Sequence, residues 1–187
     1  MRLKSRRLDF ISKEIDMQDI LIVVDMQNDF IDGALGTHEA QAIVPYVLSL
    51  VKSHTGRVIF TKDTHSPDYL STSEGRNLPV PHCIKGTNGW EICPSLQEYA
   101  KEVIEKPTFG SLDLAEQLKA ENEKDPIGKI TLVGLCTDIC VISNTLLLKA
   151  TFPEAEISVN SSACAGVTPE SHENALNAMK MCQIIIK

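Results

Sequence analysis

Short apolar runs alternate along this chain with longer stretches in which apolar residues recur at helical spacing. Continuous apolar runs of strand length are typical of parallel strands buried on both faces. Six candidates of this kind lie at residues 20–24, 57–61, 103–104, 130–133, 157–159 and 184–186. Helical patterns lie between them at residues 40–53, 112–123, 141–150 and 169–181. This alternation predicts an α/β fold, with a mainly parallel, doubly wound, six-stranded sheet and helices on both faces.

The expected domain begins where the regular pattern begins, at Asp19. Residues 19–187 are enough for a single domain with one core, and we expect a three-layer, Rossmann-like arrangement. Residues 1–18 carry five of the chain's 18 Lys and Arg but lack the apolar core of a signal peptide. They are interpreted as a basic N-terminal arm, or as an upstream start ahead of Met17. The last helix has the clearest beginning, because Thr168 can cap it and Pro169 suits its first position.

The overall composition narrows the class of partner. The net charge is −7 and 43% of the residues are hydrophobic, which is typical of a globular chain and disfavours nucleic acid or an anionic membrane as a partner. The longest apolar runs are too short to span a membrane. Six cysteines without paired CxxC spacing favour reduced thiols over a disulfide scaffold or a structural zinc site. We therefore expect a cytoplasmic protein, and we expect it to form a homo-oligomer.

Reactive side chains follow four of the predicted strands. Asp25 follows the first, Asp63 and His65 follow the second, Lys106 follows the third and Cys140 follows the fourth. Taken alone, Asp25 could cap a helix and Lys106 could be a solvated surface lysine. Ligands bind at the carboxyl edge of open parallel sheets. Four reactive residue types at successive strand ends therefore favour one site at that edge.

The stretch from Lys129 to Cys140 is an apolar run that breaks at Gly134 and brings a cysteine to the start of a helical segment. Backbone N–H groups at such a position favour a thiolate over a thiol and could receive an oxyanion. A buried packing cysteine is the alternative interpretation of Cys140. A long connection at residues 66–95, rich in Pro, Gly, Ser and Asn, is typical of a functional loop.

Five sequence signals together resemble one enzyme superfamily. They are DMQNDF at residues 25–30, TKDTH at 61–65, HCIKGT at 82–87, Lys106, and GLCTDIC at 134–140. The pattern is similar to that of the isochorismatase-like cysteine hydrolases, and within them to the nicotinamidase/pyrazinamidase branch. The resemblance runs in order from about Asp19 to the C-terminus.

The resemblance implies an amide hydrolase that acts on the carbon–nitrogen bond of a small-molecule linear amide. Nicotinamide would be converted to nicotinate and ammonia. The family's catalytic residues correspond to Asp25 as base, Lys106 as cationic partner and Cys140 as the nucleophile that carries a thioester. The resemblance also implies a cis peptide between Leu135 and Cys136, so that the backbone N–H groups of Cys136 and Cys140 form an oxyanion hole.

The resemblance further implies one divalent metal ion, with zinc expected and iron or manganese as alternatives. Asp63, His65 and His82 match the family's ligand set. A second histidine is frequent at the position of Ser71, and some relatives use a glutamate that corresponds to Glu74 instead. Glu74 is therefore expected as the fourth ligand, with a solvated loop glutamate as the alternative interpretation.

The substrate is less well determined than the reaction. Phe30 and Phe109 are expected to contact the substrate ring, although an apolar residue at a strand exit is often only part of the core. Many nicotinamidases carry a tryptophan where this chain has Pro79, and the only tryptophan here is Trp90. A hydrolase acting on another small amide, or on a carbamoyl or ureido compound, remains an alternative. A non-catalytic small-molecule binding protein is a further one.

Overall fold

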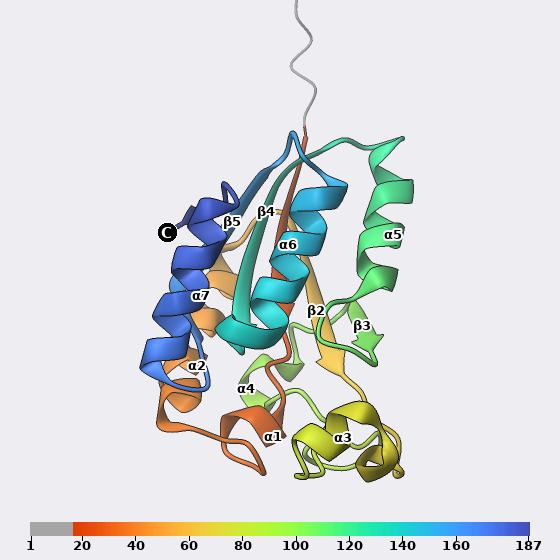
Figure 1. Cartoon of the computed structure of the whole chain (residues 1–187). Helices are drawn as coiled ribbons and strands as arrows, with labels where there is room; N and C mark the ends of the chain where they lie inside the picture. Colours follow the sequence, from red (N-terminus) through yellow and green to blue (C-terminus); the bar gives the residue numbers. More distant parts are fainter. Residues whose placement is uncertain (1–16) are drawn as a thin grey trace, which may run out of the picture.

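A computed structural model of the chain describes residues 17–187 (Figure 1). Most of the expected N-terminal arm, residues 1–16, lies outside the described residues. Gln18, which the sequence pattern assigned to the arm, is the first residue of the first strand and pairs with Ile127. The ordered domain therefore begins at least one residue earlier than expected.

The core of the domain is a six-stranded sheet in the order β3-β2-β1-β4-β5-β6, and all neighbouring strands run parallel. This confirms the predicted doubly wound α/β fold. The strands are β1 (Gln18–Val24), β2 (Arg57–Asp63), β3 (Val103–Lys106), β4 (Ile127–Leu135), β5 (Glu156–Ala165) and β6 (Ile185–Ile186). The strand order reverses between β1 and β4, and in such sheets ligands bind outside the carboxyl ends at this point.

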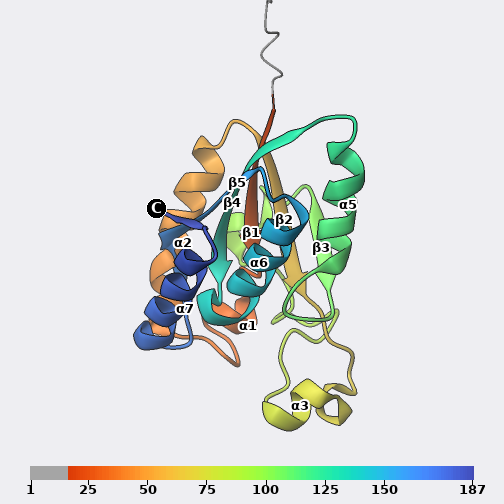
Figure 2. The same ribbon diagram turned by 45° about the horizontal axis from the view of Figure 1, so that its top comes forward.

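Helices cover both faces of the sheet (Figures 1 and 2). One face carries α5 (Leu112–Asn122), α6 (Ile142–Thr151) and α7 (Pro169–Met181), and the other carries α2 (His38–Ser53) and α4 (Pro94–Gln97). As predicted, Thr168 caps α7, accepting a hydrogen bond from the N–H of Ser171, and Pro169 begins the helix. None of the helices formed by residues 17–187 is both long and apolar enough to cross a membrane.

Strand β1 is apolar throughout its second half because both of its faces are buried. Ile20, Ile22 and Val24 pack into the core beneath α5, α6 and α7. Leu21 and Val23 point to the opposite side and pack into the core beneath α2 and α4. Successive side chains of a strand point to opposite faces of the sheet, and in β1 both faces are covered by a hydrophobic layer.

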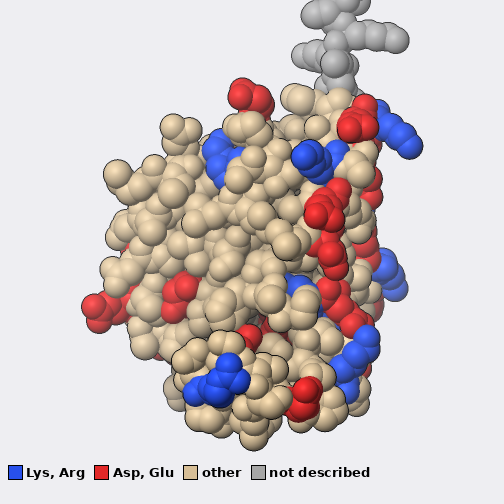
Figure 3. All heavy atoms as spheres, turned by 45° about the vertical axis from the view of Figure 1, so that its right-hand side comes forward, with Lys and Arg blue, Asp and Glu red and all other residues tan. Residues whose placement is uncertain are grey.

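Ion pairs orient α5 against the sheet. Arg57 of β2 pairs with Glu102, which lies just before β3, at 2.6 Å, and also pairs with Glu121 of α5. Acidic side chains gather on this side of the molecule, with lysine and arginine side chains among them (Figure 3). These partly exposed pairs orient α5, whereas its attachment depends on the buried side chains of Leu114 and Leu118.

Several short helical segments had no counterpart in the predicted pattern. They are α1 (Asn28–Ile31), η1 (Tyr69–Ser71), α3 (Ser73–Asn77), α4, and the π-helical turn η2 (Thr137–Val141). Helices of one or two turns show no readable periodicity and are held by contacts with distant residues. The long connection at residues 66–95 contains η1 and α3, and α3 projects beyond the carboxyl ends of the strands (Figure 2).

Gly134 allows β1 and β4 to approach each other closely at their carboxyl ends. Its φ is +113°, and a Cβ atom there would lie 2.1 Å from the carbonyl oxygen of Val24. Any side chain at this position would therefore push apart the two central strands where the candidate residues leave the sheet. Only glycine satisfies both the backbone angle and the contact.

We expect Gly134→Ala to lower the free energy of unfolding by about 3 kcal/mol, because it adds a backbone clash to an unfavourable φ. Gly86→Ala is the matched control: Gly86 also has a positive φ, +84°, but a Cβ atom added there would meet no other atom within 4 Å. That substitution should cost only about 1 kcal/mol. Urea unfolding of both variants measures the difference, and equal costs would contradict a close approach at Gly134.

Candidate active site

Three reactive side chains meet beneath the carboxyl edge of the sheet. Lys106 ends β3, Asp25 directly follows β1, and Cys140 lies in η2 after β4. The ammonium nitrogen of Lys106 lies 2.6 Å from Asp25 Oδ2 and 3.4 Å from Cys140 Sγ. Asp25 and Lys106 are fully buried, and Cys140 is 4% exposed. The structure thus brings together Asp25, Lys106 and Cys140, which we call the buried trio.

Neighbouring polar groups hold the buried trio in place. The hydroxyl of Thr61 donates a hydrogen bond of 2.6 Å to Asp25 Oδ1. Lys106 also donates to Asp63 Oδ1 at 3.3 Å and to the carbonyl oxygen of Thr108 at 3.2 Å. The ammonium group therefore has a partner for each of its donors, as a buried charge requires.

Burial and the neighbouring charges both shift the pKa values of these three groups. Burial raises the pKa of Asp25, and the nearby Lys106 ammonium only partly offsets it. Burial and the Asp25 carboxylate raise the pKa of the Cys140 thiol well above its usual range, against the effect of Lys106. Burial alone would lower the pKa of Lys106, but Asp25, Cys140 and Asp63 raise it. Lys106 therefore stays charged at neutral pH.

The sequence analysis expected backbone N–H groups at a helix start to favour a Cys140 thiolate, and burial shifts the pKa of the thiol in the opposite direction. Cys140 lies inside the π-helical turn and is 4% exposed, so burial is the largest influence on the pKa of its thiol. Among the neighbouring charged groups, the Asp25 carboxylate raises this pKa most.

A second group of side chains lies beside the buried trio. The ligand-type atoms of its four members all lie within 4.8 Å of one another. We call this group, Asp63, His65, Glu74 and His82, the acid–histidine cluster. His65 Nε2 lies 2.9 Å from Asp63 Oδ2 and 3.5 Å from Glu74 Oε1, and His82 Nε2 lies 3.6 Å and 3.8 Å from the same two oxygens.

The donor set of this cluster fits a divalent metal ion. His65 Nε2 is buried and makes no hydrogen bond, although a carboxylate oxygen lies close to it. His82 Nδ1 donates a hydrogen bond to the carbonyl oxygen of Val80 at 2.8 Å. The lone pair of the other ring nitrogen, Nε2, is therefore available to a metal ion. Glu74, whose side chain is 20% exposed, faces the cluster and is not a solvated loop residue. Nitrogen and oxygen atoms thus converge on a common point, as metal ligands do.

A family model described as the isochorismatase domain matches residues 19–187. The chain belongs to the isochorismatase family. A nicotinamidase from Schizosaccharomyces pombe is 27% identical to it, over 88% of this chain and 90% of that protein. The pyrazinamidase of Pyrococcus horikoshii in complex with zinc superposes with a TM-score of 0.77 at 30% identity, covering 91% of this chain and 98% of that one. The N-carbamoylsarcosine amidase of Thermoplasma acidophilum superposes with a TM-score of 0.74 at 28% identity, covering 91% and 96%.

In this isochorismatase-family chain, residues that the sequence analysis did not single out hold the acid–histidine cluster. The fully buried Gln27 donates to the carbonyl oxygen of Asp63 at 2.8 Å and accepts from its N–H at 2.7 Å. The ring of Tyr69 lies 4.7 Å from that of His65 and 5.0 Å from that of His82. The Asp29 carboxylate accepts a hydrogen bond from the N–H that follows His82. Gln27 and Asp29 belong to the DMQNDF motif, whereas Tyr69 carried no sequence signal.

The turn that carries Cys140 is tied to the loop after β3. Asn144, fully buried, donates to the carbonyl oxygens of Cys140 at 2.8 Å and Phe109 at 3.0 Å and accepts from the N–H of Ser111. The peptide bond between Leu135 and Cys136 is cis, as the family resemblance implied. Asn144 was not anticipated, because two of its partners, Ser111 and Phe109, lie more than 30 residues away in sequence.

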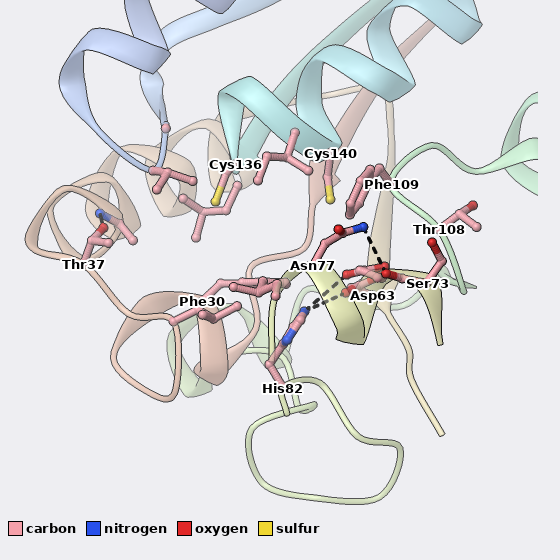
Figure 4. Close-up of a pocket in the computed structure, with 18 residues that line it drawn as sticks. Phe30, Thr37, Asp63, Ser73, Asn77, His82, Thr108, Phe109, Cys136 and Cys140 are labelled. Carbon is pink, nitrogen blue, oxygen red and sulfur yellow. Dashed lines mark hydrogen bonds and ion pairs between the residues drawn. The ribbon is translucent and has the colours of Figure 1, made fainter. Parts of the chain in front are cut away.

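A single cavity of about 620 Å³ joins the two groups (Figure 4). Cys140 lines it together with Asp63, Glu74 and His82. Phe30 and Phe109, expected from the sequence to contact a substrate, both line it, and Trp90 instead stacks beneath Lys62 outside it. Cys136 also faces the cavity, and burial raises the pKa of its thiol to about 12. Its side chain is therefore neutral at physiological pH.

We expect Lys106→Met to lower the free energy of unfolding by about 3–5 kcal/mol, because it leaves buried carboxylates without their cation. Adding Asp25→Asn to the same chain should restore part of that loss. Lys85→Met is the control, since it removes an exposed ion pair with Glu105 and should cost less than about 1 kcal/mol. Urea unfolding measures all of these variants, and a Lys106→Met cost no larger than the control would contradict a buried charge network.

Proposed function

We propose that this protein is a cysteine-dependent amidohydrolase that releases ammonia from a small amide, with nicotinamide as the expected substrate and nicotinate as the product. The observation that carries this proposal is that one cavity is lined by Cys140 of the buried trio and by three members of the acid–histidine cluster, Asp63, Glu74 and His82. The similarity to proteins named nicotinamidase and pyrazinamidase supports the same reaction class.

The reaction begins with a proton transfer inside the buried trio. Asp25 takes the proton of the Cys140 thiol, and its raised pKa makes it a stronger base than an exposed carboxylate. Lys106 stabilises the thiolate at the moment when it forms. The sulfur then attacks the amide carbonyl carbon, and the negative oxygen is received by the backbone N–H groups of Cys136 and Cys140.

Breakdown of this intermediate completes the cycle. The carbon–nitrogen bond breaks, and the leaving nitrogen takes the proton from Asp25 and departs as ammonia, which leaves a thioester on Cys140. Water then attacks the thioester while Asp25 accepts its proton, and the carboxylic acid leaves as the sulfur regains a proton. Asp25 thus acts first as base and then as acid.

Asp63, His65, Glu74 and His82 would hold the metal ion, with zinc expected and iron or manganese as alternatives. When bound, a divalent ion supplies a Lewis acid that can accept the ring nitrogen of the substrate. Phe30 and Phe109, on either side of the cavity, provide apolar surfaces for the ring.

A second candidate substrate class is supported by the structural similarity to an N-carbamoylsarcosine amidase. In this alternative the same buried trio would attack a carbamoyl or ureido carbon. The acid–histidine cluster favours an aromatic nitrogen ligand as substrate and therefore nicotinamide.

Wild-type protein should release ammonia from nicotinamide, and Cys140→Ala should reduce the rate by a factor of roughly 10⁴ or more, because the covalent nucleophile is gone. Cys164→Ala is the matched control, since Cys164 is a buried cysteine of β5 outside the cavity lining. Ammonia release from N-carbamoylsarcosine but not from nicotinamide would favour the second substrate class. Binding of these compounds without any release would favour a non-catalytic binding protein.

Removal of Glu74 tests the metal proposal without measuring activity. We expect Glu74→Ala to weaken binding of zinc by tenfold or more, on the order seen when groups around a metal are deleted. Glu154→Ala, at an exposed glutamate, should leave zinc affinity unchanged. Metal content by mass spectrometry and zinc titration measure both, and an undiminished zinc affinity in Glu74→Ala would remove this residue from the ligand set.

A further inference from the structure

The cavity has two chemically different ends. Asp63 and His82 lie at one end and Thr37 lies at the other, with Cys136 and Phe30 between them (Figure 4). The end around Thr37 includes the start of α2, where Leu35 and Ala40 lie beside Thr37 in sequence, and the end of β4, because Leu135 packs in the same hydrophobic cluster as Ala40. The N–H of Val167, in the connection from β5 to α7, donates a hydrogen bond to Asp138 of η2. We call the lining residues Leu35, Thr37, Ala40, Leu135 and Val167 the apolar lobe.

The apolar lobe offers an extended hydrophobic surface. Its one hydroxyl, on Thr37, already accepts a hydrogen bond from the N–H of Ala40 at the start of α2. Val167 is 52% exposed, and Phe109, across the cavity, is 44% exposed. Apolar side chains in a concave site gain free energy when a ligand removes them from water.

The volume of the cavity exceeds what nicotinamide needs. At about 620 Å³, it lies within the range of roughly 300–1,000 Å³ that encloses drug-sized ligands. Nicotinamide is a single aromatic ring with one carboxamide group. A ring held between Phe30 and the acid–histidine cluster, with its carbonyl at Cys140, leaves the apolar lobe unfilled.

The buried trio determines which part of a substrate can extend. The leaving nitrogen must approach Asp25, because that carboxyl group gives it a proton. Asp25 and Lys106 are fully buried and lie outside the cavity lining, which Cys140 reaches alone among the trio. A substituent on the leaving nitrogen would therefore meet packed protein. A substituent on the acyl side can continue along the cavity.

We infer that the preferred substrates are primary amides whose heteroaromatic acyl group carries an apolar alkyl or aryl substituent that fills the apolar lobe. This inference rests on the proposed amidohydrolase function and specifies its substrate class. The lobe acts as a subsite for the acyl group, and amides substituted on the leaving nitrogen are excluded.

The experiment compares nicotinamide with two isomers that carry the same propyl group, one on a ring carbon and one on the amide nitrogen. Burial of a methylene is worth about 0.8 kcal/mol, or roughly fourfold in kcat/KM. The ring-propyl amide should therefore exceed nicotinamide by about 10- to 50-fold in kcat/KM. The N-propyl isomer should be a poorer substrate than nicotinamide. A ring-propyl amide that is no better than nicotinamide would overturn the inference.

Two substitutions test whether the apolar lobe causes the preference for the ring-propyl amide. Val167→Asp places a carboxylate there and should lower the preference for the ring-propyl amide over nicotinamide by tenfold or more. Met181→Asp is the control, because Met181 is 85% exposed at the end of α7, and it should leave the preference unchanged. An equal preference in Val167→Asp and wild type would overturn the assignment of the lobe.

Failure of the inference can be distinguished from failure of the proposed function. Hydrolysis of nicotinamide without a preference for the ring-propyl amide would overturn the lobe and leave the function standing. If none of the amides is hydrolysed, calorimetric binding of the two propyl isomers still tests the lobe, and equal affinities would overturn it. Sedimentation showing a dimer that Val167→Asp dissociates would assign these side chains to a subunit contact and also overturn it.

Discussion

A single buried ammonium group organises the carboxyl edge of this sheet. Lys106 contacts Asp25, Asp63 and Cys140, which arrive from β1, β2 and the turn after β4. Removing a lysine from water is costly unless opposite charges and acceptors surround it. The side chains at the ends of these strands must therefore lie close to the Lys106 ammonium group. The close contact of β1 with β4 at Gly134 makes this convergence possible.

Asp63 connects the chemistry of the two halves of the site. One of its oxygens faces Lys106 and the other faces the imidazoles of His65 and His82. The nearby imidazoles of His65 and His82, together with the charge of Lys106, outweigh burial and hold the pKa of Asp63 well below its usual range. The carboxylate thus stays ionised between a cation and a cluster of ligand atoms. Gln27 bonds to both the N–H and the carbonyl oxygen of Asp63, which fixes the backbone that carries this carboxylate.

Burial raises the pKa of the Cys140 thiol. A thiolate at Cys140 would have to share a closed environment with the Asp25 carboxylate, and that repulsion raises the pKa of the thiol. In the proposed reaction, the proton would leave the sulfur when a substrate occupies the cavity and the sulfur can bond to carbon. Such coupling of proton transfer to substrate binding would keep a buried thiol from reacting unproductively.

The sequence by itself determined the six strands, the four long helices and the residues that meet at the sheet edge, because apolar periodicity and strand exits are local properties. It also named all members of the buried trio and the acid–histidine cluster, through motifs that span the chain. Only the tertiary structure decided that Glu74 faces the cluster, that Tyr69 packs against both imidazoles, and that Asn144 ties Phe109 to Cys140. It also decided how deeply Cys140 is buried, which raises the pKa of its thiol. These features depend on burial and on partners distant in sequence, which no local pattern records.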